Sequence, residues 1–304
     1  MSFASFVFSQ AVGSRGLSRR VWIWVRRALV RWAGDPVCKM AVHGRMLNIN
    51  LSHALPGYQA RHPMYDSLPR RLGEFLRTRH GAVVGIDVGA NVGDTVAAFI
   101  GGAQDRFLAV EPNPKFFRIL QSNWADDDRV TIIDTICSSS SQEGHFAIRE
   151  RNGTASIVPS ANGTDMAQRP LDEIVIAHST FARCNLIKVD TDGHDFEVLD
   201  GAAGVIGRNR PTVLFECDSF GRRDYIETVL RTLDMFRRSG YRRYLVYDNF
   251  GFLMGCHELD NHQRMKDLLF YQLISEFNYY DLLVLPETDF NHFHESEVAL
   301  FSGS

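Results

Sequence analysis

Short apolar runs alternate with amphipathic segments from residue 82 to the end of the chain. The first run, 82–88, is almost wholly apolar and ends at a glycine, as expected for a strand buried on both faces. Six more strands are expected at 106–111, 130–136, 186–190, 212–216, 244–247 and 280–285, and helices at 93–100, 114–124, 195–199, 224–238 and 263–277. This alternation predicts an α/β fold, a doubly wound, mainly parallel sheet of seven strands of the Rossmann-like kind.

Residues 1–80 are expected to form an N-terminal extension to a domain that spans 81–304. The extension contains a basic amphipathic helix at 17–33, a short β-like stretch that turns at His43-Gly44, and a helix at 65–77. One side of the first helix carries Arg19, Arg20, Arg27 and Arg31, and another carries Val21, Trp24, Val25, Ala28 and Trp32. Such a helix is typical of peripheral membrane contact. The alternative is that its apolar face packs on the protein's own body or on a second subunit of a homo-oligomer.

An irregular interval, 137–184, separates the third and fourth expected strands. It is rich in Ser, Asn, Gly and Thr. Loops carried by a rigid sheet commonly form binding surfaces. We therefore expect this interval to be an insertion on the acceptor side of the ligand site.

Composition limits the location and the partners of the protein. The net charge of −3 gives no indication of nucleic-acid binding, which requires a basic surplus or patch. The five cysteines are scattered and never spaced C-x-x-C, so we expect reduced thiols. No apolar run approaches the ~20 residues of a membrane-spanning helix, and the N-terminus lacks the layout of a signal peptide. We expect a cytoplasmic protein, with peripheral attachment at the inner face of the membrane left open.

The end of the first strand has the features of a cofactor loop. The sequence D-V-G-A-N-V-G-D-T (87–95) has glycines where the backbone must turn sharply and approach a ligand. Glu111 ends the second strand, where a carboxylate can bind both hydroxyls of a ribose. A dinucleotide site would have G-x-G-x-x-G, whereas D-x-G-x-x-x-G favours S-adenosylmethionine (SAM). The candidate cofactor-binding residues are Asp87, Gly89, Ala90, Asn91, Gly93, Asp94, Glu111, Pro112, Asn113, Asp134, Thr135 and Asp190.

The fourth strand ends in K-V-D-T-D-G-H-D (188–195), which brings several carboxylates to the same edge of the sheet. Crowded carboxylates raise one another's pKa, which suits a general base, or they bind a divalent cation such as Mg²⁺ or Ca²⁺, and both alternatives stay open. Asp195 is expected to cap the next helix, and Lys188 to pair with one of the acids. The candidate catalytic residues are Asp190, Asp192, His194 and Glu216, with His194 or Asp192 as the base, and no residue is assigned as a dedicated metal ligand.

Four strings together resemble the FkbM-type methyltransferases: G-I-D-V-G-A-N-V-G-D-T (85–95), V-E-P-N-P (110–114), I-K-V-D-T-D-G-H-D-F-E-V-L-D-G-A (187–202) and P-T-V-L-F-E (211–216). The resemblance covers about residues 82–217, and the third string is its most specific part. It implies a class I methyltransferase fold, SAM as the cofactor and O-methylation, mostly of sugar or polyketide hydroxyls. Asp192 and Asp195 stand where the family usually has Glu.

The expected function is therefore SAM-dependent methyl transfer to a hydroxyl, with a carbohydrate or glycolipid as the partner, in the synthesis of a glycan or related natural product. Two alternatives stay open. One is a non-catalytic SAM-binding or scaffold protein in which the acidic cluster is structural. The other is a nicotinamide-dependent oxidoreductase, which the loop pattern disfavours.

Overall fold

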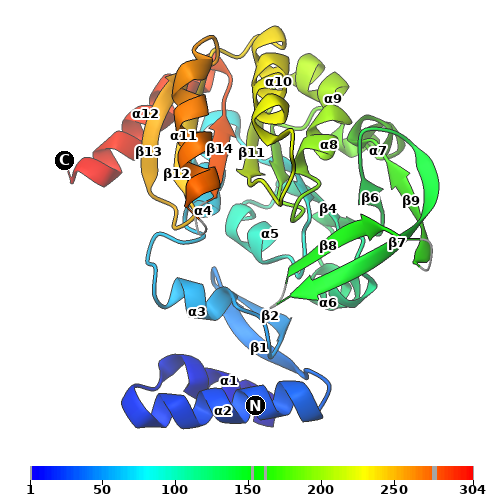
Figure 1. Cartoon of the computed structure of the whole chain (residues 1–304), viewed down its shortest axis with the longest axis vertical. Helices are drawn as coiled ribbons and strands as arrows, with labels where there is room; N and C mark the ends of the chain where they lie inside the picture. Colours follow the sequence, from blue (N-terminus) through cyan, green and yellow to red (C-terminus); the bar gives the residue numbers. More distant parts are fainter. Residues whose placement is uncertain (1, 152–153, 161–162, 276–278, 304) are drawn as a thin grey trace.

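The computed structural model describes residues 2–151, 154–160, 163–275 and 279–303. Its centre is a sheet with helices on both faces (Figure 1), in the strand order β13-β12-β14-β11-β10-β3-β4-β5. The strands are β3 (Val84–Val88), β4 (Arg106–Val110), β5 (Val130–Ile133), β10 (Leu186–Val189), β11 (Thr212–Cys217), β12 (Arg243–Asp248), β13 (Leu253–Glu258) and β14 (Tyr280–Val284). Strand β14 runs antiparallel to β11 and β12, and β13 runs antiparallel to β12, while the other neighbours are parallel.

The expected α/β fold with its doubly wound sheet is confirmed, and all seven expected strands are present. The sheet has an eighth strand, β13, which the sequence did not predict. Most residues of β13 are half-buried, because it lies at the edge of the sheet, and it therefore lacks the continuous apolar run of a central strand.

The two faces of the sheet bury two separate hydrophobic cores. In β4, Leu108 and Val110 face one core and Phe107 and Ala109 face the other, as expected for side chains that alternate along a strand. The first core is covered by α7 (Leu171–Ala177), α8 (Asp195–Asp200), α9 (Ala203–Asn209), α10 (Tyr225–Arg238) and α11 (His262–Ile274). The second is covered by α5 (Asp94–Phe99), α6 (Pro114–Trp124), α12 (Glu287–Ser302) and parts of the N-terminal extension.

The N-terminal extension has more structure than expected. Its elements are α1 (Phe3–Gly13), α2 (Gly16–Trp32), β1 (Val37–Val42), β2 (Arg45–Asn50), α3 (Leu55–Gln59) and α4 (Leu68–His80). The helix at 17–33, the hairpin and the helix near 65–77 were expected, whereas α1 and α3 were not. Leu47, Ile49 and Leu72 are fully buried in the same core as Phe107 of the sheet. The extension therefore packs into the body of the protein, and Figure 1 shows α1 and α2 side by side at its far end.

The interval 137–184 is not irregular, contrary to expectation. Strands β6 (Ile136–Cys137), β9 (Thr164–Arg169), β7 (Gln142–Arg151) and β8 (Thr154–Pro159) form a separate four-stranded sheet in that order. Within 142–148, Phe146 is buried and its neighbours are exposed or half-buried. The sequence did not reveal this sheet because, where burial is described, it contains no long apolar run: in β9 only Gln168 is buried, and β6 has two residues. None of the helices in the described part of the chain is long and apolar enough to span a membrane.

A buried carboxylate fixes the start of the two central strands β3 and β4. The Asp105 side chain accepts hydrogen bonds from the backbone N–H groups of Val83 (2.9 Å), Gly101 (2.9 Å) and Gly102 (2.7 Å), and its Oδ2 lies 3.0 Å from Arg77 Nη2. Burial raises the pKa of Asp105, but the three N–H groups and Arg77 together hold it below its ordinary value. The charged form of Asp105 thus stabilises the folded state.

We predict that Asp105→Asn lowers the free energy of unfolding by about 2–3 kcal/mol at pH 7, because charge-assisted hydrogen bonds are lost. The folded-state pKa is depressed, so this contribution is present above the unfolded-state pKa and is lost as the pH falls below about 4. In urea unfolding, the difference in the free energy of unfolding between the wild type and Asp105→Asn should therefore become smaller at acid pH. The exposed Glu74→Gln should change stability by less than about 0.5 kcal/mol. If this difference in the free energy of unfolding did not depend on pH, the charged form of Asp105 would not be the source of the stabilisation.

Candidate functional site

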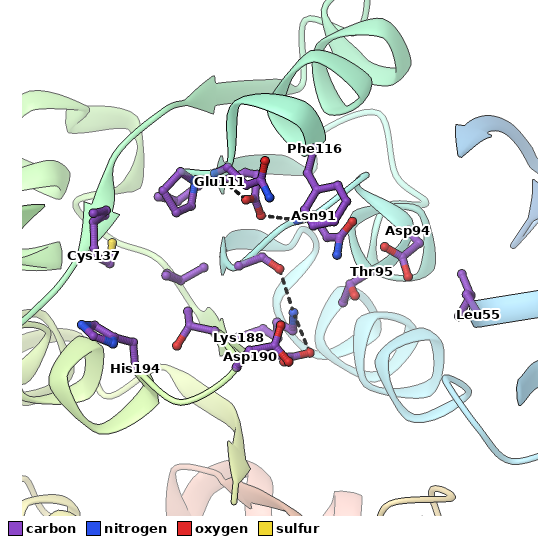
Figure 2. A pocket seen from close by; sticks show the side chains of 18 of the residues that line it. Leu55, Asn91, Asp94, Thr95, Glu111, Phe116, Cys137, Lys188, Asp190 and His194 are labelled. Carbon is purple, nitrogen blue, oxygen red and sulfur yellow. Dashed lines mark hydrogen bonds and ion pairs between the residues drawn. The ribbon is translucent and has the colours of Figure 1, made fainter. Parts of the chain in front are cut away.

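A cavity lies at the carboxyl ends of β3, β4 and β10, where ligands bind in doubly wound sheets (Figure 2). It encloses about 1070 Å³ of empty space, including the part open to solvent. The sequence-predicted residues in its wall are Gly89, Asn91, Asp94, Glu111, Pro112, Asn113, Thr135, Asp190, Asp192 and His194. Asp87, Ala90, Gly93 and Asp134 are not part of the wall, and Glu216 lines a neighbouring pocket.

The loop that follows β3 is packed so tightly that glycine is required at two positions. A Cβ on Gly89 would lie 1.8 Å from the carbonyl oxygen of Asp190, and a Cβ on Gly93 would lie 2.1 Å from Trp124 Nε1. Both glycines also have a positive φ, of +81° and +83°. From the other side, Trp124 Nε1 donates to the Gly93 carbonyl (3.1 Å) and Asn123 Nδ2 donates to the Val92 carbonyl (2.9 Å). Helix α6 thus holds the loop in place.

Glu111 follows β4, and its carboxylate links this strand end to the glycine loop. One oxygen accepts a hydrogen bond from the backbone N–H of Asn91 (2.8 Å), and the other accepts one from Asn113 (2.8 Å). Burial raises the pKa of Glu111 to about 7, although both N–H groups act in the opposite direction. Each oxygen keeps a second lone pair that can accept a hydroxyl hydrogen. This geometry suits the expected binding of a ribose.

The ends of the cavity differ in character. Cys137 and His194 lie at one end in Figure 2, while Asp94, Thr95 and Leu55 lie at the other. Thr135, Ile136 and Cys137 belong to the wall of the first end, and both Ile136 and Cys137 are buried. The buried ring of Phe116, on α6, adds a flat apolar surface near Glu111. A nucleoside could therefore place its sugar at Glu111 and its base against these apolar groups.

Lys188 is a buried cation at the centre of this strand edge. Its Nζ lies 3.2 Å from Asp87 Oδ1, 3.3 Å from Asp190 Oδ2 and 3.4 Å from the Gly89 carbonyl oxygen. Burial by itself lowers the pKa of Lys188, but the charges of Asp190 and Asp87 raise it above its ordinary value. The expected pairing of Lys188 with an acid is thus present. Asp87 lies fully buried opposite Lys188 on the paired strands, outside the wall of the cavity.

The turn after β10 is fixed by Asp195. Its carboxylate accepts hydrogen bonds from the N–H groups of Thr191 (2.9 Å) and Gly193 (3.2 Å), both of which precede it. We expected Asp195 to cap α8, but it is the first residue of that helix and binds backward into the turn instead. Burial raises its pKa to about 7 and lowers the pKa of His194. Asp192, with a φ of 51°, faces the cavity from the same turn.

A second pocket adjoins the first, and Tyr65, Thr95, Lys188 and Asp190 line both. Its other polar residues are Asp66, Glu216, Asn249, Tyr279 and Asp281. Glu216 on β11 is directly opposite Asp281 on β14. Burial, followed by the charge of Asp190, raises the pKa of Glu216 well above its ordinary value and that of Asp281 to about 8. Burial thus favours the neutral form of both carboxyl groups, next to the Lys188–Asp190 contact.

The N-terminal extension supplies wall residues that the sequence did not reveal: His53, Leu55, Tyr58 and Tyr65. His53 Nδ1 accepts the N–H of Leu55 (3.3 Å), and burial lowers the pKa of His53 to about 4, so its ring is neutral. No local pattern marks these residues, because they reach the site only through the packing of the extension. Asp281 was missed for the same reason, since β14 is distant in sequence from the other strand ends.

The described part of the chain contains no group of three or more His, Cys, Asp or Glu side chains that could hold a metal ion. Asp87 and Asp190 contact the ammonium of Lys188, which provides a positive charge for both. The divalent cation that the sequence left open is therefore not supported.

Several solved structures are similar to this chain. Among solved structures, an FkbM methyltransferase of Methylobacillus flagellatus KT shares 18% identity at a TM-score of 0.40, over 63% of this chain and 55% of its own, so the chain spans about half of that relative. Aeropyrum pernix fibrillarin, in complex with bound S-adenosyl-L-methionine, shares 13% identity at a TM-score of 0.39, over 83% of both chains. The METTL16 MTase domain shares 13% identity at a TM-score of 0.42, over 86% of this chain and 79% of its own.

No curated protein sequence matches the chain. The family described as "Methyltransferase FkbM domain" matches residues 87–243, just over half of the 304 residues. The match begins in β3 at the glycine loop and ends at the start of β12, so it includes the ends of β3, β4, β10 and β11 that form both pockets. The chain belongs to the FkbM methyltransferase family.

Proposed function

We propose that the protein is a SAM-dependent methyltransferase that methylates a hydroxyl group of its acceptor. The observation that carries this proposal is the junction of two pockets at Lys188 and Asp190. One pocket has the features of a nucleoside site, and the other has a wall of carboxylates and tyrosines. A methyl donor and an acceptor bound in the two pockets would meet at Asp190.

The residues of the first pocket fit SAM. Glu111 would accept hydrogen bonds from the ribose hydroxyls, and Phe116 with the 135–137 segment would contact the adenine. SAM also carries an ammonium and a sulfonium, both positive, and the carboxylates of Asp94 and Asp190 line the same cavity. The cofactor supplies an activated methyl group, so the protein has to align the acceptor and accept its proton.

The transfer is an in-line displacement. The acceptor oxygen forms a bond to the methyl carbon while the carbon–sulfur bond breaks, and the electron pair of that bond stays on sulfur, which leaves S-adenosylhomocysteine. The hydroxyl proton passes to a carboxylate. Asp190 is the best-placed acceptor of that proton, because it lines both pockets, whereas Asp192 and His194 line only the first. Lys188 Nζ lies 3.3 Å from Asp190 Oδ2 and holds this side chain in place.

The second pocket supports a carbohydrate as the acceptor, in a glycan, a glycolipid or a related natural product. In their neutral forms, which burial favours, the carboxyl groups of Glu216 and Asp281 can donate hydrogen bonds to sugar oxygens, while carboxylate oxygens in the same pocket can accept them. Tyr65 and Tyr279 add aromatic surface with polar hydroxyl groups. A pocket with donors and acceptors on several sides suits a ligand with several hydroxyl groups.

Glu111→Ala should weaken the binding of S-adenosylhomocysteine by roughly 10- to 100-fold or more, because hydrogen bonds to a charged group contribute about 1.5–3 kcal/mol each. Isothermal titration calorimetry measures this change, and thermal unfolding checks that the variant is folded. Glu143→Ala, at an exposed position on β7, is the matched control and should bind like the wild type. Equal affinity of Glu111→Ala and the wild type would disprove the site, and no binding by folded wild type would disprove the proposed function.

Asp190→Asn should reduce kcat by about 10²- to 10⁴-fold, the usual contribution of a general base, and should weaken the binding of S-adenosylhomocysteine by a smaller factor, because Asp190 also lines the cofactor cavity. The assay is release of S-adenosylhomocysteine from SAM with a panel of carbohydrate acceptors. Asp192→Asn, in the same turn but outside the second pocket, should have a smaller effect. A larger loss in Asp192→Asn than in Asp190→Asn would assign the base to Asp192. SAM binding without turnover on every acceptor would favour the scaffold alternative.

Asp281→Asn should remove a loss of stability at alkaline pH. The folded-state pKa of Asp281 is raised to about 8, so in the wild type the free energy of unfolding falls as the pH rises from about 4 to about 8, where half of the folded protein has the ionised carboxylate. The asparagine cannot ionise, so the difference in the free energy of unfolding between variant and wild type should shift in favour of the variant by about 5–6 kcal/mol at most, since about four pKa units count about 1.4 kcal/mol each. Urea unfolding at pH 5, 7 and 9 tests this, and parallel pH profiles would show that Asp281 is ionised in the folded protein.

A further inference from the structure

Helix α2 presents an apolar strip that the rest of the chain does not cover. None of its 17 residues is buried. Leu17, Val21, Trp24 and Trp32 lie three, four or eight positions apart, on one side of the helix, and are 79%, 58%, 70% and 81% exposed. Two tryptophans this exposed on one helix are unusual for a surface that faces only water.

The opposite side of α2 is the one that attaches to the protein. Trp22 packs edge-on against Phe6 of α1, with 5.4 Å between the ring centroids. Arg26 donates to the backbone carbonyls of Leu51 (2.6 Å) and His53 (2.8 Å). The apolar strip therefore does not pack on the protein's own body, which was one of the alternatives that the sequence left open. In Figure 1 α1 and α2 form the end of the molecule farthest from the central sheet.

The charge next to this strip has one sign. Residues 2–34 contain six arginines and no acidic residue. Three of these arginines are exposed: Arg20 lies four positions before Trp24, and Arg27 and Arg31 lie three and seven positions after it. This spacing places them along the edge of the strip. No ion pair joins any of the six arginines to an acidic side chain in the described part of the chain. The surface therefore combines an apolar strip with a row of positive charges that lack counter-charges.

A groove between α2 and α3 extends the basic surface toward the cofactor cavity. Its wall includes Arg19, Arg26, Arg27 and Arg61 and no acidic residue. Tyr58 of α3 lines both this groove and the cofactor cavity. Guanidinium groups grouped in this way bind phosphate well, because each offers several N–H donors in a planar arrangement.

We propose that the apolar strip of α2 and its arginines bind the surface of a bilayer that contains anionic lipids. The helix lies parallel to the surface, Trp24 and Trp32 enter the boundary between headgroups and acyl chains, and the arginines contact lipid phosphates. A second copy of the chain fits less well. A two-fold interface through this strip would bring the arginines of both copies together, with no acidic residue of the helix to offset them.

The test uses the full chain and vesicles of phosphatidylcholine, with or without 30% phosphatidylglycerol, in a flotation assay at low and at 0.5 M salt. The wild type should float with the anionic vesicles at low salt and much less at high salt. Arg20→Gln/Arg27→Gln/Arg31→Gln should weaken binding roughly 100-fold, because each arginine near the surface contributes about 1 kcal/mol. Trp24→Ser/Trp32→Ser should weaken it by tenfold or more, since each buried aromatic side chain contributes about 1.5–3 kcal/mol.

The matched control is Ile176→Ser/Phe270→Ser, which removes two exposed apolar side chains from α7 and α11 and should bind like the wild type. Thermal unfolding and S-adenosylhomocysteine binding check each variant, since none of the changed residues lines the cofactor cavity. Equal binding to neutral and anionic vesicles, or no binding, would overturn the proposal. So would a wild-type dimer in light scattering that Trp24→Ser/Trp32→Ser converts to a monomer, since the strip would then bind a second copy. None of these measurements depends on whether the protein transfers methyl groups, so failure of this proposal and failure of the proposed function can be distinguished.

Discussion

The ammonium of Lys188, buried between the carboxylates of Asp87 and Asp190, holds the functional edge of the sheet together. It lies on β10, opposite Asp87 on β3, and also reaches the carbonyl of the glycine loop. A buried charge is tolerated only with partners, and removal of one partner commonly costs about 3–5 kcal/mol. Asp87 secures the lysine from inside the sheet, and the lysine holds Asp190 where the two pockets meet. The position of the proposed base thus depends on Asp87, which is fully buried and lies outside the walls of both pockets.

The region around Lys188 contains more carboxylates than one cation can neutralise. Burial raises the pKa of Asp94, Glu111 and Asp195 to about 7 and that of Asp281 to about 8. Carboxyl groups of this kind disfavour the binding of an anionic ligand. They favour a cationic ligand, because a nearby positive charge lowers their pKa and stabilises their ionised forms. This distribution of charge is the reason that a sulfonium cofactor fits the cavity better than a dinucleotide with its pyrophosphate.

The sequence predicted the elements whose structure is determined by residues close together in the chain. Central strands such as β3 and β10 are buried on both faces, so their apolar runs were evident, and the glycine loop and Glu111 followed from strand-end chemistry. The edge strand β13 and the sheet of β6 to β9 lack such runs. At the site, the sequence placed Asp87 beside the cofactor, although it is buried beneath the loop. It did not reveal His53, Tyr58, Tyr65 or Asp281, because only tertiary packing brings them there.

The family match begins at residue 87, yet His53, Tyr58 and Tyr65 close the cavity from the other side. The part with the family signature provides the cofactor half of the site, and a segment outside it provides much of the remaining wall. Of these three residues, only Tyr65 also lines the second pocket, so it is the one through which the N-terminal segment reaches both pockets. The family match therefore covers only part of the residues that enclose the cavity, and the rest of the wall is built by a segment that the family signature does not describe.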